Sequence, residues 1–365
     1  MKLCILGDAG SVHVQRIASS LAARGHTVHL VSAKPERIPG VNVERFEVPG
    51  PSVRNLRRWR GRHHRYLRSL LERFDVVNVQ FLADWGLTPE IMRHGCVVVT
   101  PWGSDMVPPP GEGLPTPELT ASRVAILRSA TAVTACGPRF AQTVAAFAGI
   151  DLDAINMTPF GVDLRVVDPA LYADRRTPGV RRVGFYKGFR EVYGAEYLVR
   201  AIPIILNRLP ETRFDLVGDG PQRSACRRLA DRLDLNGAVN WIPPQPHRKI
   251  PQWLSMWDVS TIPSLCESFG VAALESSAMC VPVAASDVGG LPDTVQHERT
   301  GLLVPPRSPK ALAGAIVRLL KDQDLRTRMG HAGREWVARE YEWSQTLDQW
   351  EQAFEQARER TLTMV

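Results

Sequence analysis

The chain has 365 residues, 44% of them hydrophobic and 23% charged, which excludes a disordered or collagen-like protein and allows two domains with separate cores. Its formal charge of +7 and a pI near 9.3 would suit a protein that binds polyanions. However, residues 54–73 hold eight arginines and one glutamate, so this segment alone carries the excess, and the chain as a whole is not predicted to bind nucleic acid.

The opening residues predict a βαβ unit. Lys2–Leu6 is a short apolar run typical of a buried parallel strand, and a glycine-containing turn at residues 7–11 follows it. A helix is predicted from Val12 to Arg24, and Thr27–Ser32 begins the next strand. Further strands are expected at 75–79, 96–100 and 130–135. The first half therefore predicts a doubly wound α/β domain.

The basic segment lies within this half. Apolar residues between 53 and 74 alternate with the arginines at near-helical spacing, interrupted by Gly61, which indicates one amphipathic helix or two. Two interpretations remain open: a solvated basic face, or contact with an anionic partner such as a lipid surface, a lipid-linked acceptor or a phosphorylated acceptor.

The second half repeats the pattern. Strands are expected at 182–186, 213–217, 239–242, 259–263, 281–285 and 301–304, and helices between them, for example at 195–208 and 222–233. After about residue 310 the chain is predicted to be helical, with aromatic residues that we interpret as packing surface: Trp336, Tyr341, Trp343, Trp350 and Phe354.

Two properties bear on location. The apolar run in the first residues is too short for a signal peptide, and no apolar run approaches the ~18–20 residues that a membrane span needs. The six cysteines are scattered without a CxxC pair, as expected for reduced, buried thiols rather than a disulfide framework. We therefore expect a cytoplasmic protein, with peripheral contact to the inner face of a membrane if the basic segment binds lipid.

The most informative stretch joins a strand to a helix at residues 263–275. Glu267 lies in the loop and Glu275 about two helical turns further on, a separation of roughly 12 Å if the whole stretch were helical. That distance is too long for the paired carboxylates of a glycoside hydrolase. It suits the two ends of an elongated polyhydroxylated ligand, although two solvated glutamates would give the same pattern.

The stretch resembles the E-x7-E motif of the retaining glycosyltransferases of family 4, which have the GT-B fold. Further segments resemble motifs of that family in the same order. They are Pro159–Asp163, the glycine turn Leu216–Pro221, Val288–Asp293 with Asp where Glu is usual, and Thr300–Pro306. The likeness is dense over residues 159–320 and looser over 1–35 and 97–105.

The resemblance implies roles on the donor side. Glu267 would hold hydroxyls of the donor sugar, helped by backbone amides, and Glu275 the ribose of a nucleotide. The other implied donor-binding residues are Gly218, Ser268, Phe269, Gly270, Gly289 and Gly290. Members of the family usually supply an Arg and a Lys to the diphosphate, and Tyr193 stands here where the lysine is usual, so Lys187 and Arg190 are the candidates for that charge.

The acceptor side would be the first half. The turn after the first strand offers Gly10 and Ser11, with His13 in the following helical turn. The segment 97–105 resembles a family segment with a histidine where this chain has Trp102, which leaves open how the sugar is held. Asp105 is a candidate acceptor contact, or else a loop aspartate that caps a helix.

The resemblance thus implies two Rossmann-like domains facing across a cleft. The boundaries expected are 1–163 for the acceptor side, 164–335 for nucleotide-sugar binding, and 336–365 for a helical segment that packs back on the first domain. The implied activity is retaining transfer of a sugar from a UDP- or GDP-sugar to an acceptor hydroxyl. No cofactor and no metal are expected, and the acceptor would be a small molecule, a saccharide or a lipid-linked group.

Three alternative functions follow from other features of the sequence. A dinucleotide-dependent oxidoreductase would need GxGxxG at the first turn and an acidic residue after the second strand, and the chain has neither. A membrane- or nucleic-acid-binding protein on the same scaffold would rest on residues 54–73 alone. A nucleotide-sugar 2-epimerase shares the architecture but does not need the E-x7-E set.

Overall fold

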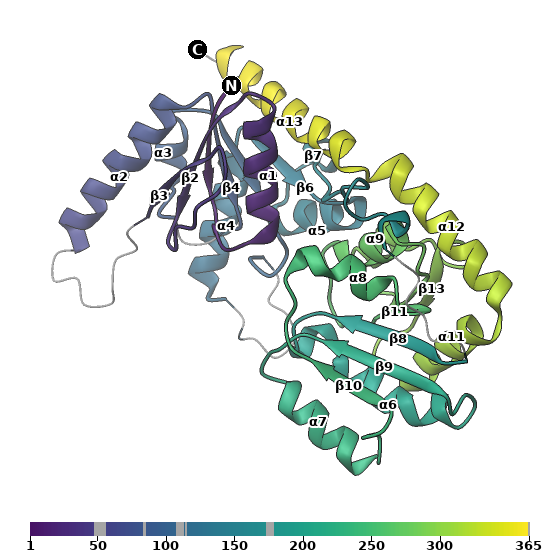
Figure 1. Cartoon of the computed structure of the whole chain (residues 1–365). Coiled ribbons are helices and arrows are strands. Elements are labelled where there is room, and N and C mark those ends of the chain that lie inside the picture. The colour runs from purple at the N-terminus through teal and green to yellow at the C-terminus, as the bar shows by residue number, and fades with distance from the viewer. Residues whose placement is uncertain (47–55, 83–84, 107–112, 114, 173–178, 364–365) are drawn as a thin grey trace. The chain divides into compact units, whose positions relative to one another are not determined.

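The computed structural model describes residues 1–46, 56–82, 85–106, 113, 115–172 and 179–363 (Figure 1). The chain divides into two compact units. The first contains Met1–Pro108, Gly113–Pro159 and Thr346–Val365, and the second is built mainly from Phe160–Gln345. The first unit thus includes the last twenty residues, whereas residues 336–345 belong to the second.

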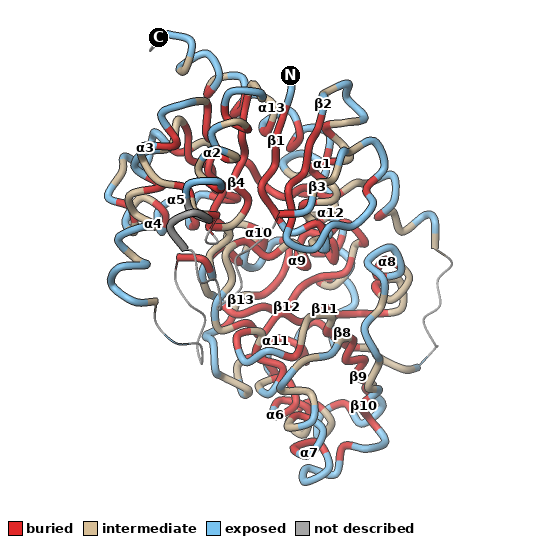
Figure 2. The backbone as a smooth tube through the Cα atoms, turned by 90° about the vertical axis from the view of Figure 1, so that its left-hand side faces the viewer, coloured by how far each residue is buried: buried red, intermediate tan, exposed pale blue. Residues whose placement is uncertain are grey.

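The first unit is built on one sheet of seven strands in the order β3-β2-β1-β4-β5-β6-β7, and each pair of neighbours is parallel. The strands are β1 (Lys2–Leu6), β2 (Thr27–Ser32), β3 (Asn42–Arg45), β4 (Val76–Gln80), β5 (Val97–Thr100), β6 (Ala132–Ala135) and β7 (Ile155–Met157). The central strands are buried along nearly their whole length (Figure 2), which is why their sequences are short apolar runs rather than alternating ones.

Helices connect these strands. They are α1 (Val12–Ala23), α2 (Leu56–Arg73), α3 (Pro89–Met92), α4 (Pro117–Ser129) and α5 (Pro138–Ala148), with a 3-10 turn η1 (Leu152–Ala154). The long C-terminal helix α13 (Trp343–Thr363) packs against this unit through the buried Trp350 and Phe354, and the Trp350 indole donates to the Pro159 carbonyl at 3.2 Å. The aromatic series of the tail is therefore packing surface, as predicted.

The second unit has a parallel six-stranded sheet in the order β10-β9-β8-β11-β12-β13. Its strands are β8 (Arg181–Tyr186), β9 (Thr212–Val217), β10 (Val239–Ile242), β11 (Val259–Ile262), β12 (Val283–Ser286) and β13 (Gly301–Val304). Its α-helices are α6 (Ala195–Leu206), α7 (Arg223–Arg232), α8 (Ile250–Leu254), α9 (Val271–Ala278), α10 (Leu291–Thr294), α11 (Pro309–Lys321) and α12 (Gln323–Glu340). Short 3-10 turns are η2 (Pro169–Leu171), η3 (Glu191–Tyr193) and η4 (His247–Lys249).

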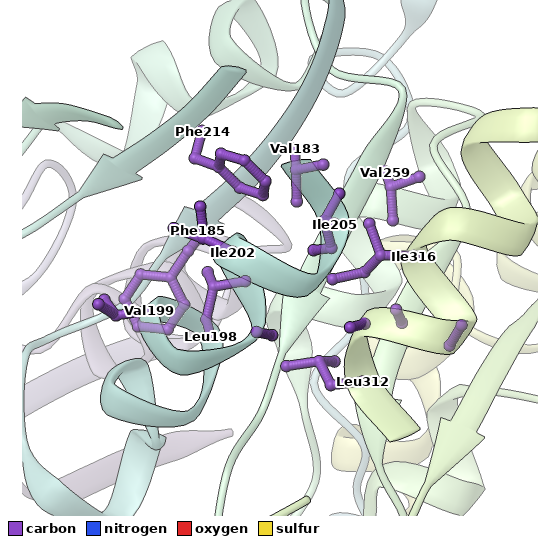
Figure 3. Close-up of a cluster of buried hydrophobic side chains, with 14 of the residues drawn as sticks. Val183, Phe185, Leu198, Val199, Ile202, Ile205, Phe214, Val259, Leu312 and Ile316 are labelled. Atoms are coloured by element: carbon purple, nitrogen blue, oxygen red, sulfur yellow. The ribbon is translucent and has the colours of Figure 1, made fainter. Parts of the chain in front are cut away.

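The main core of the second unit lies between its sheet and helices α6 and α11 (Figure 3). Leu198, Val199, Ile202 and Ile205 recur on one face of α6 and are fully buried. Facing them are Val183, Phe185 and Phe214 from the sheet and Leu312 and Ile316 from α11. This packing holds β8 and β9 in place beneath the loops described below.

Both sheets reverse their strand order at one point, between β1 and β4 in the first unit and between β8 and β11 in the second. In open α/β sheets such a switch point leaves a crevice at the carboxyl ends of the two strands, where ligands bind. The two positions therefore define where the functional residues are to be sought.

Three features differ from the sequence prediction. The edge strand β3 and the short β7 were not predicted, because both are short and β3 is largely exposed. Helix α2 runs through Gly61 without a break, since that glycine is exposed and the buried Leu67, Leu70 and Leu71 anchor the helix further along. The predicted strands and the α/β fold are confirmed. Arg54, the first arginine of the predicted basic segment, lies outside the described residues.

Candidate functional site

The loops after β8 and β11 meet at the switch point of the second sheet. The Leu265 amide donates to the Val192 carbonyl at 2.7 Å. Gly194 has φ +64°, and a Cβ there would stand 1.9 Å from the Pro263 carbonyl oxygen. Only glycine therefore permits this approach of the two loops.

An ion pair joins the two loops. Lys187, directly after β8, donates from Nζ to Oε2 of Glu267 in the loop after β11, and the Ser264 hydroxyl lies 3.4 Å from the same oxygen. The two charged side chains are only 14% and 13% exposed. The Lys187 ammonium also lies 4.5 Å from the centre of the Tyr193 ring. The structure thus brings together two of the predicted residues, 80 positions apart in the chain, and adds Tyr193 to them.

The glycines after β12 hold Glu267 in place. Gly289 has φ +50°, and a Cβ there would stand 1.9 Å from the carbonyl oxygen of Glu267. A Cβ on Gly290 would stand 2.2 Å from the Ser268 carbonyl oxygen, and the Gly290 amide donates to the Glu267 carbonyl at 2.8 Å. Gly289 and Gly290 thus pack against the backbone of residues 267 and 268, and this close packing fixes the loop that carries Glu267 and Ser268.

The remaining predicted donor-side residues occupy the same edge. Gly218 follows β9 with φ +137°, and a Cβ there would stand 2.2 Å from the Lys187 carbonyl oxygen. Gly270 is the N-cap of α9 in a left-handed conformation, and Phe269 beside it is buried. Arg190 is exposed at the start of η3, three residues beyond Lys187 in the chain, and its contribution to the charge stays a prediction.

Glu275 is buried on α9, with 5% of its surface exposed. Its Oε2 lies 3.0 Å from the Tyr186 hydroxyl, and its Oε1 is bonded to His247 Nε2 from η4. Burial, and next the Glu275 carboxylate, raise the pKa of the Tyr186 phenol well above its usual value, so this hydroxyl stays protonated. Sequence reasoning missed Tyr186 and His247, since no local pattern links them to a carboxylate 89 and 28 positions away.

At the switch point of the first sheet, Asp105 organises the loop after β5. The side chain is fully buried, and its oxygens accept backbone N–H groups of Leu82 at 2.8 Å, Trp102 at 2.9 Å and Gly103 at 2.7 Å. Burial raises the pKa of this carboxyl group, against the lowering effect of the amides. The expectation that Asp105 contacts an acceptor does not fit this burial, so Asp105 instead positions the neighbouring Trp102.

A cavity of about 540 Å³ lies at the same edge, near the other acceptor-side candidates. Ser11, the N-cap of α1, and Trp102 line it. Gly10 donates its amide to Asp8 Oδ1 at 2.9 Å and so shapes the turn beside the cavity. His13 is half-buried with its ring 5.8 Å from the Trp102 ring, edge to face. The structure therefore brings Ser11, His13 and Trp102 together.

Several other chemistries lack support. None of the six cysteines forms a disulfide. Partial burial of the Cys266 thiol, and next the Glu267 carboxylate, raise the pKa of this thiol, which disfavours a thiolate beside the site. In the part of the chain that the structure describes, no group of three or more His, Cys, Asp or Glu side chains could hold a metal ion. Among the described helices, none combines the length and apolar character needed to cross a membrane.

Family comparison agrees with this geometry. Residues 175–336 match the model of the group 1 glycosyl transferases, and residues 10–166 match that of glycosyltransferase family 4. The chain belongs to the group 1, family 4 glycosyltransferases. Outside these two matches lie residues 1–9, residues 167–174 and the chain from residue 337 on, which includes the end of α12 and the whole of α13.

Curated relatives match over part of the chain. A GDP-mannose-dependent phosphatidylinositol monomannoside mannosyltransferase of Mycobacterium tuberculosis is 36% identical over 157 residues, 41% of each chain. A D-inositol 3-phosphate glycosyltransferase of Nocardia farcinica is 36% identical over 195 residues, 50% of this chain and 43% of that protein. The chain spans about half the length of the curated relatives it matches.

Solved structures match over nearly the whole chain. A glycosyltransferase from Rickettsia africae superposes with a TM-score of 0.80 at 18% identity, covering 98% of both chains. Anabaena HepE in complex with UDP and glucose superposes with a TM-score of 0.75 at 17% identity, covering 97% of this chain and 99% of that one. At such identities the likeness establishes the fold, two Rossmann-like domains of the GT-B type.

Proposed function

We propose that this protein is a retaining glycosyltransferase that moves a sugar from a UDP- or GDP-sugar to an acceptor hydroxyl without a metal ion. The observation that carries the proposal is the Lys187–Glu267 pair at the switch point of the second sheet. The Lys187 ammonium can bind the negatively charged diphosphate, and the adjacent Glu267 carboxylate can accept hydrogen bonds from sugar hydroxyls. A sugar diphosphate requires both groups close together. The nucleotide-sugar complexes among proteins of the same fold support this choice of donor.

In the proposed mechanism the bond between the anomeric carbon and the diphosphate oxygen breaks while the acceptor oxygen bonds to the same face of that carbon. The acceptor proton passes to the departing phosphate oxygen, so no protein nucleophile is needed. Lys187 stabilises the negative charge that grows on the diphosphate. Glu267 orients the sugar hydroxyls, and Glu275 accepts hydrogen bonds from the ribose.

The test is transfer from radiolabelled UDP- and GDP-sugars by the full chain and by Glu267→Gln and Glu275→Gln variants. We expect Glu267→Gln to lower kcat at least a hundredfold, and Glu275→Gln to raise the KM for the donor. Glu191→Gln, an exposed glutamate at the start of η3, is the matched control and should retain full activity. Full activity in both site variants would contradict the assignment.

Two further measurements decide the finer claims. The anomeric configuration of the product, read by NMR coupling constants, should equal that of the donor. Activity should survive excess EDTA, because the charge on the leaving group would be met by Lys187 rather than by a metal ion. An inverted product or complete loss of activity with EDTA would contradict the corresponding claim.

We also propose that helix α2 contacts an anionic membrane surface. Its apolar stripe is already buried in the first unit, as Leu67 and Leu70 are each 1% exposed, whereas Arg62, Arg65 and Arg68 are exposed. Since the apolar face is not available for insertion, binding would be electrostatic and weakened by salt. Such contact would suit a lipid-linked acceptor.

Sedimentation with phosphatidylglycerol-containing vesicles at low and high NaCl tests this second proposal. Arg62→Ser/Arg65→Ser should weaken binding about thirtyfold, at about 1 kcal/mol per arginine. The control is Arg228→Ser/Arg232→Ser on helix α7, which removes two exposed arginines from the other unit. Equal losses in both double variants would show a response to net charge alone and contradict a specific role for α2.

A further inference from the structure

The second unit has a cavity of about 320 Å³ on the far edge of its sheet from Lys187 and Glu267. Among its lining residues, Asp258 directly precedes β11 and Pro282 directly precedes β12, whereas Glu267 lies after β11. The two ends of parallel strands lie at opposite edges of a sheet, so this cavity is separate from the site of Lys187 and Glu267. Its volume is within the range of small-molecule sites, roughly 300–1,000 Å³.

Part of the wall comes from a segment that neither family match covers. Pro169 and Tyr172 line the cavity, and both lie between residue 166, where one match ends, and residue 175, where the other begins. The Tyr172 hydroxyl donates to the Val166 carbonyl at 3.3 Å, a contact within this linker. The cavity therefore includes residues from outside the two matched regions.

A buried carboxylate oxygen without a hydrogen bond also lines the cavity. The Asp258 side chain is 9% exposed, and its Oδ2 accepts the Arg182 amide at 2.8 Å. In the part of the chain that the structure describes, no hydrogen bond reaches Oδ1, because Arg326 Nη2 stands 3.6 Å away. Arg326 Nη1 donates instead to the carbonyls of Leu319 and Leu320 at 3.0 and 3.2 Å. A buried carboxylate is stabilised when its oxygens accept hydrogen bonds, so a ligand that donates to Oδ1 would be favoured.

The position between Asp258 and Arg326 calls for a donor and an acceptor side by side. The carboxylate Oδ1 can only accept, and the guanidinium Nη2 can only donate. A phosphate or carboxylate would place its negative charge against Asp258, and an ammonium group would face Arg326. A neutral group that carries both functions is therefore the best match.

The other charges around the cavity do not change this balance. Helix α12 begins there at Gln323, and the side chain of Asp322 caps it, while α9 presents its opposite end at Met279, so the partial charges of the helix ends offset each other. Burial raises the pKa of the Cys280 thiol, which stays neutral. His331, further along α12, is exposed, so solvent screens its charge.

The rest of the lining favours a flat, apolar ligand body. Five buried apolar side chains line the cavity: Leu254, Trp257, Met279, Val281 and Pro282. A polyol would leave several of its hydroxyls unpaired against such a surface. A heteroaromatic ring with its polar atoms along one edge would not, because its faces are apolar.

We infer that this cavity binds the aminopyrimidine edge of a nucleobase, as found in cytosine and adenine. The exocyclic N–H donates to Asp258 Oδ1, the neighbouring ring nitrogen accepts from Arg326 Nη2, and the ring lies against the apolar residues. A carboxylate that accepts from a nucleobase amino group is an established pairing. The inference does not rest on the proposed transferase function, because none of these residues belongs to the site of Lys187 and Glu267.

The test is isothermal calorimetry and ligand-observed NMR of the full chain with 1-methylcytosine and 9-methyladenine, which carry this edge but neither ribose nor phosphate. Both bases should bind, and excess UDP should not displace them. 1,N4,N4-Trimethylcytosine, which has no amino hydrogen, should bind at least tenfold more weakly, because it cannot donate to Asp258.

Variants locate the binding. Asp258→Asn should weaken binding of 1-methylcytosine at least tenfold, since its amide oxygen can still accept the Arg182 N–H while its NH₂ group meets the amino group of the base. Thr327→Phe changes an exposed lining residue of α12 and should block binding by occupying the cavity. Asp324→Asn is the matched control, because Asp324 is exposed on α12 outside the lining, and it should leave binding unchanged.

The outcomes decide the inference separately from the proposed function. It fails if neither base binds, if the trimethylated base binds as tightly as 1-methylcytosine, if UDP displaces the bases, or if binding is unchanged in either folded variant of the lining. Thermal unfolding checks the fold, and Thr327→Phe carries the test if Asp258→Asn does not fold. Absence of sugar transfer from UDP- and GDP-sugars, with base binding intact, would contradict the proposed function alone.

Discussion

The two sheets carry different chemistry at equivalent positions. At the switch point between β8 and β11, Lys187 and Glu267 form an ion pair that is largely shielded from solvent. At the switch point between β1 and β4, the described residues that line the cavity include three aromatic side chains and one charge of each sign. The same topology thus provides the location in both units, and the side chains after the strands decide the chemistry.

Substitution of Lys187 should give the largest effect, because it removes the cation of the ion pair in the second unit. Lys187→Gln should lower kcat for sugar transfer about 10²–10³-fold, because the charge that develops on the leaving group then lacks its stabilising partner. Steady-state kinetics with the donor at saturation measure this. Lys249→Gln changes an exposed lysine of η4 in the same unit and should leave kcat unchanged. A similar kcat for both variants would place the essential cation elsewhere.

Loop packing at the second site can be tested with two glycines. Gly289→Ala should lower the free energy of unfolding by about 1–3 kcal/mol and reduce activity, because its φ is +50° and the added Cβ meets the Glu267 carbonyl. Gly314→Ala, in the middle of α11 with open space around it, should instead stabilise by about 0.5–1 kcal/mol. Urea unfolding measures both. Equal stability of the two variants would contradict the role given to Gly289.

A milder change tests how Glu275 is oriented. Tyr186→Phe removes the hydroxyl that lies 3.0 Å from Glu275 and should raise the KM for the donor about tenfold with little change in kcat. Initial rates over a range of donor concentrations separate the two parameters. Tyr197→Phe on α6 is the conservative control. A loss confined to kcat would mean that Tyr186 acts on the chemical step instead.

The smallest effect is expected at Cys266, next to Glu267. Cys266→Ser should change kcat/KM less than about twofold, since the raised pKa of this thiol leaves little thiolate near neutral pH. Thiol labelling of the native protein should become faster only at a pH above the range in which an ordinary cysteine thiol ionises, and the variant should lose that signal. The buried Cys4, with a pKa raised to about 12, should stay unlabelled while the protein is folded. A Cys266→Ser variant without activity would show that the thiol is needed, and would contradict a mechanism that depends only on charged groups.

Local patterns were enough to predict most of the fold. Short apolar strands, glycine turns and amphipathic helices predicted most of the elements of both units, because parallel strands are buried on both faces and their sequences show it. The strand β3 was missed because its residues are mostly polar and largely exposed, and β7 because three residues are too few to produce a pattern. Gly61 was a misleading signal, since an exposed glycine is tolerated inside a helix that packs firmly through other residues.

The sequence by itself determined the family, the two α/β units and the stretch that carries Glu267 and Glu275. The tertiary structure alone decided which residues meet. It paired Lys187 with Glu267 and placed Tyr186 and His247 on Glu275. It also buried Asp105 and used the glycines at 289 and 290 to fix a loop. The physical reason is that strand order brings together the ends of strands that are far apart in the chain, and no local pattern of residues records which ends will be neighbours.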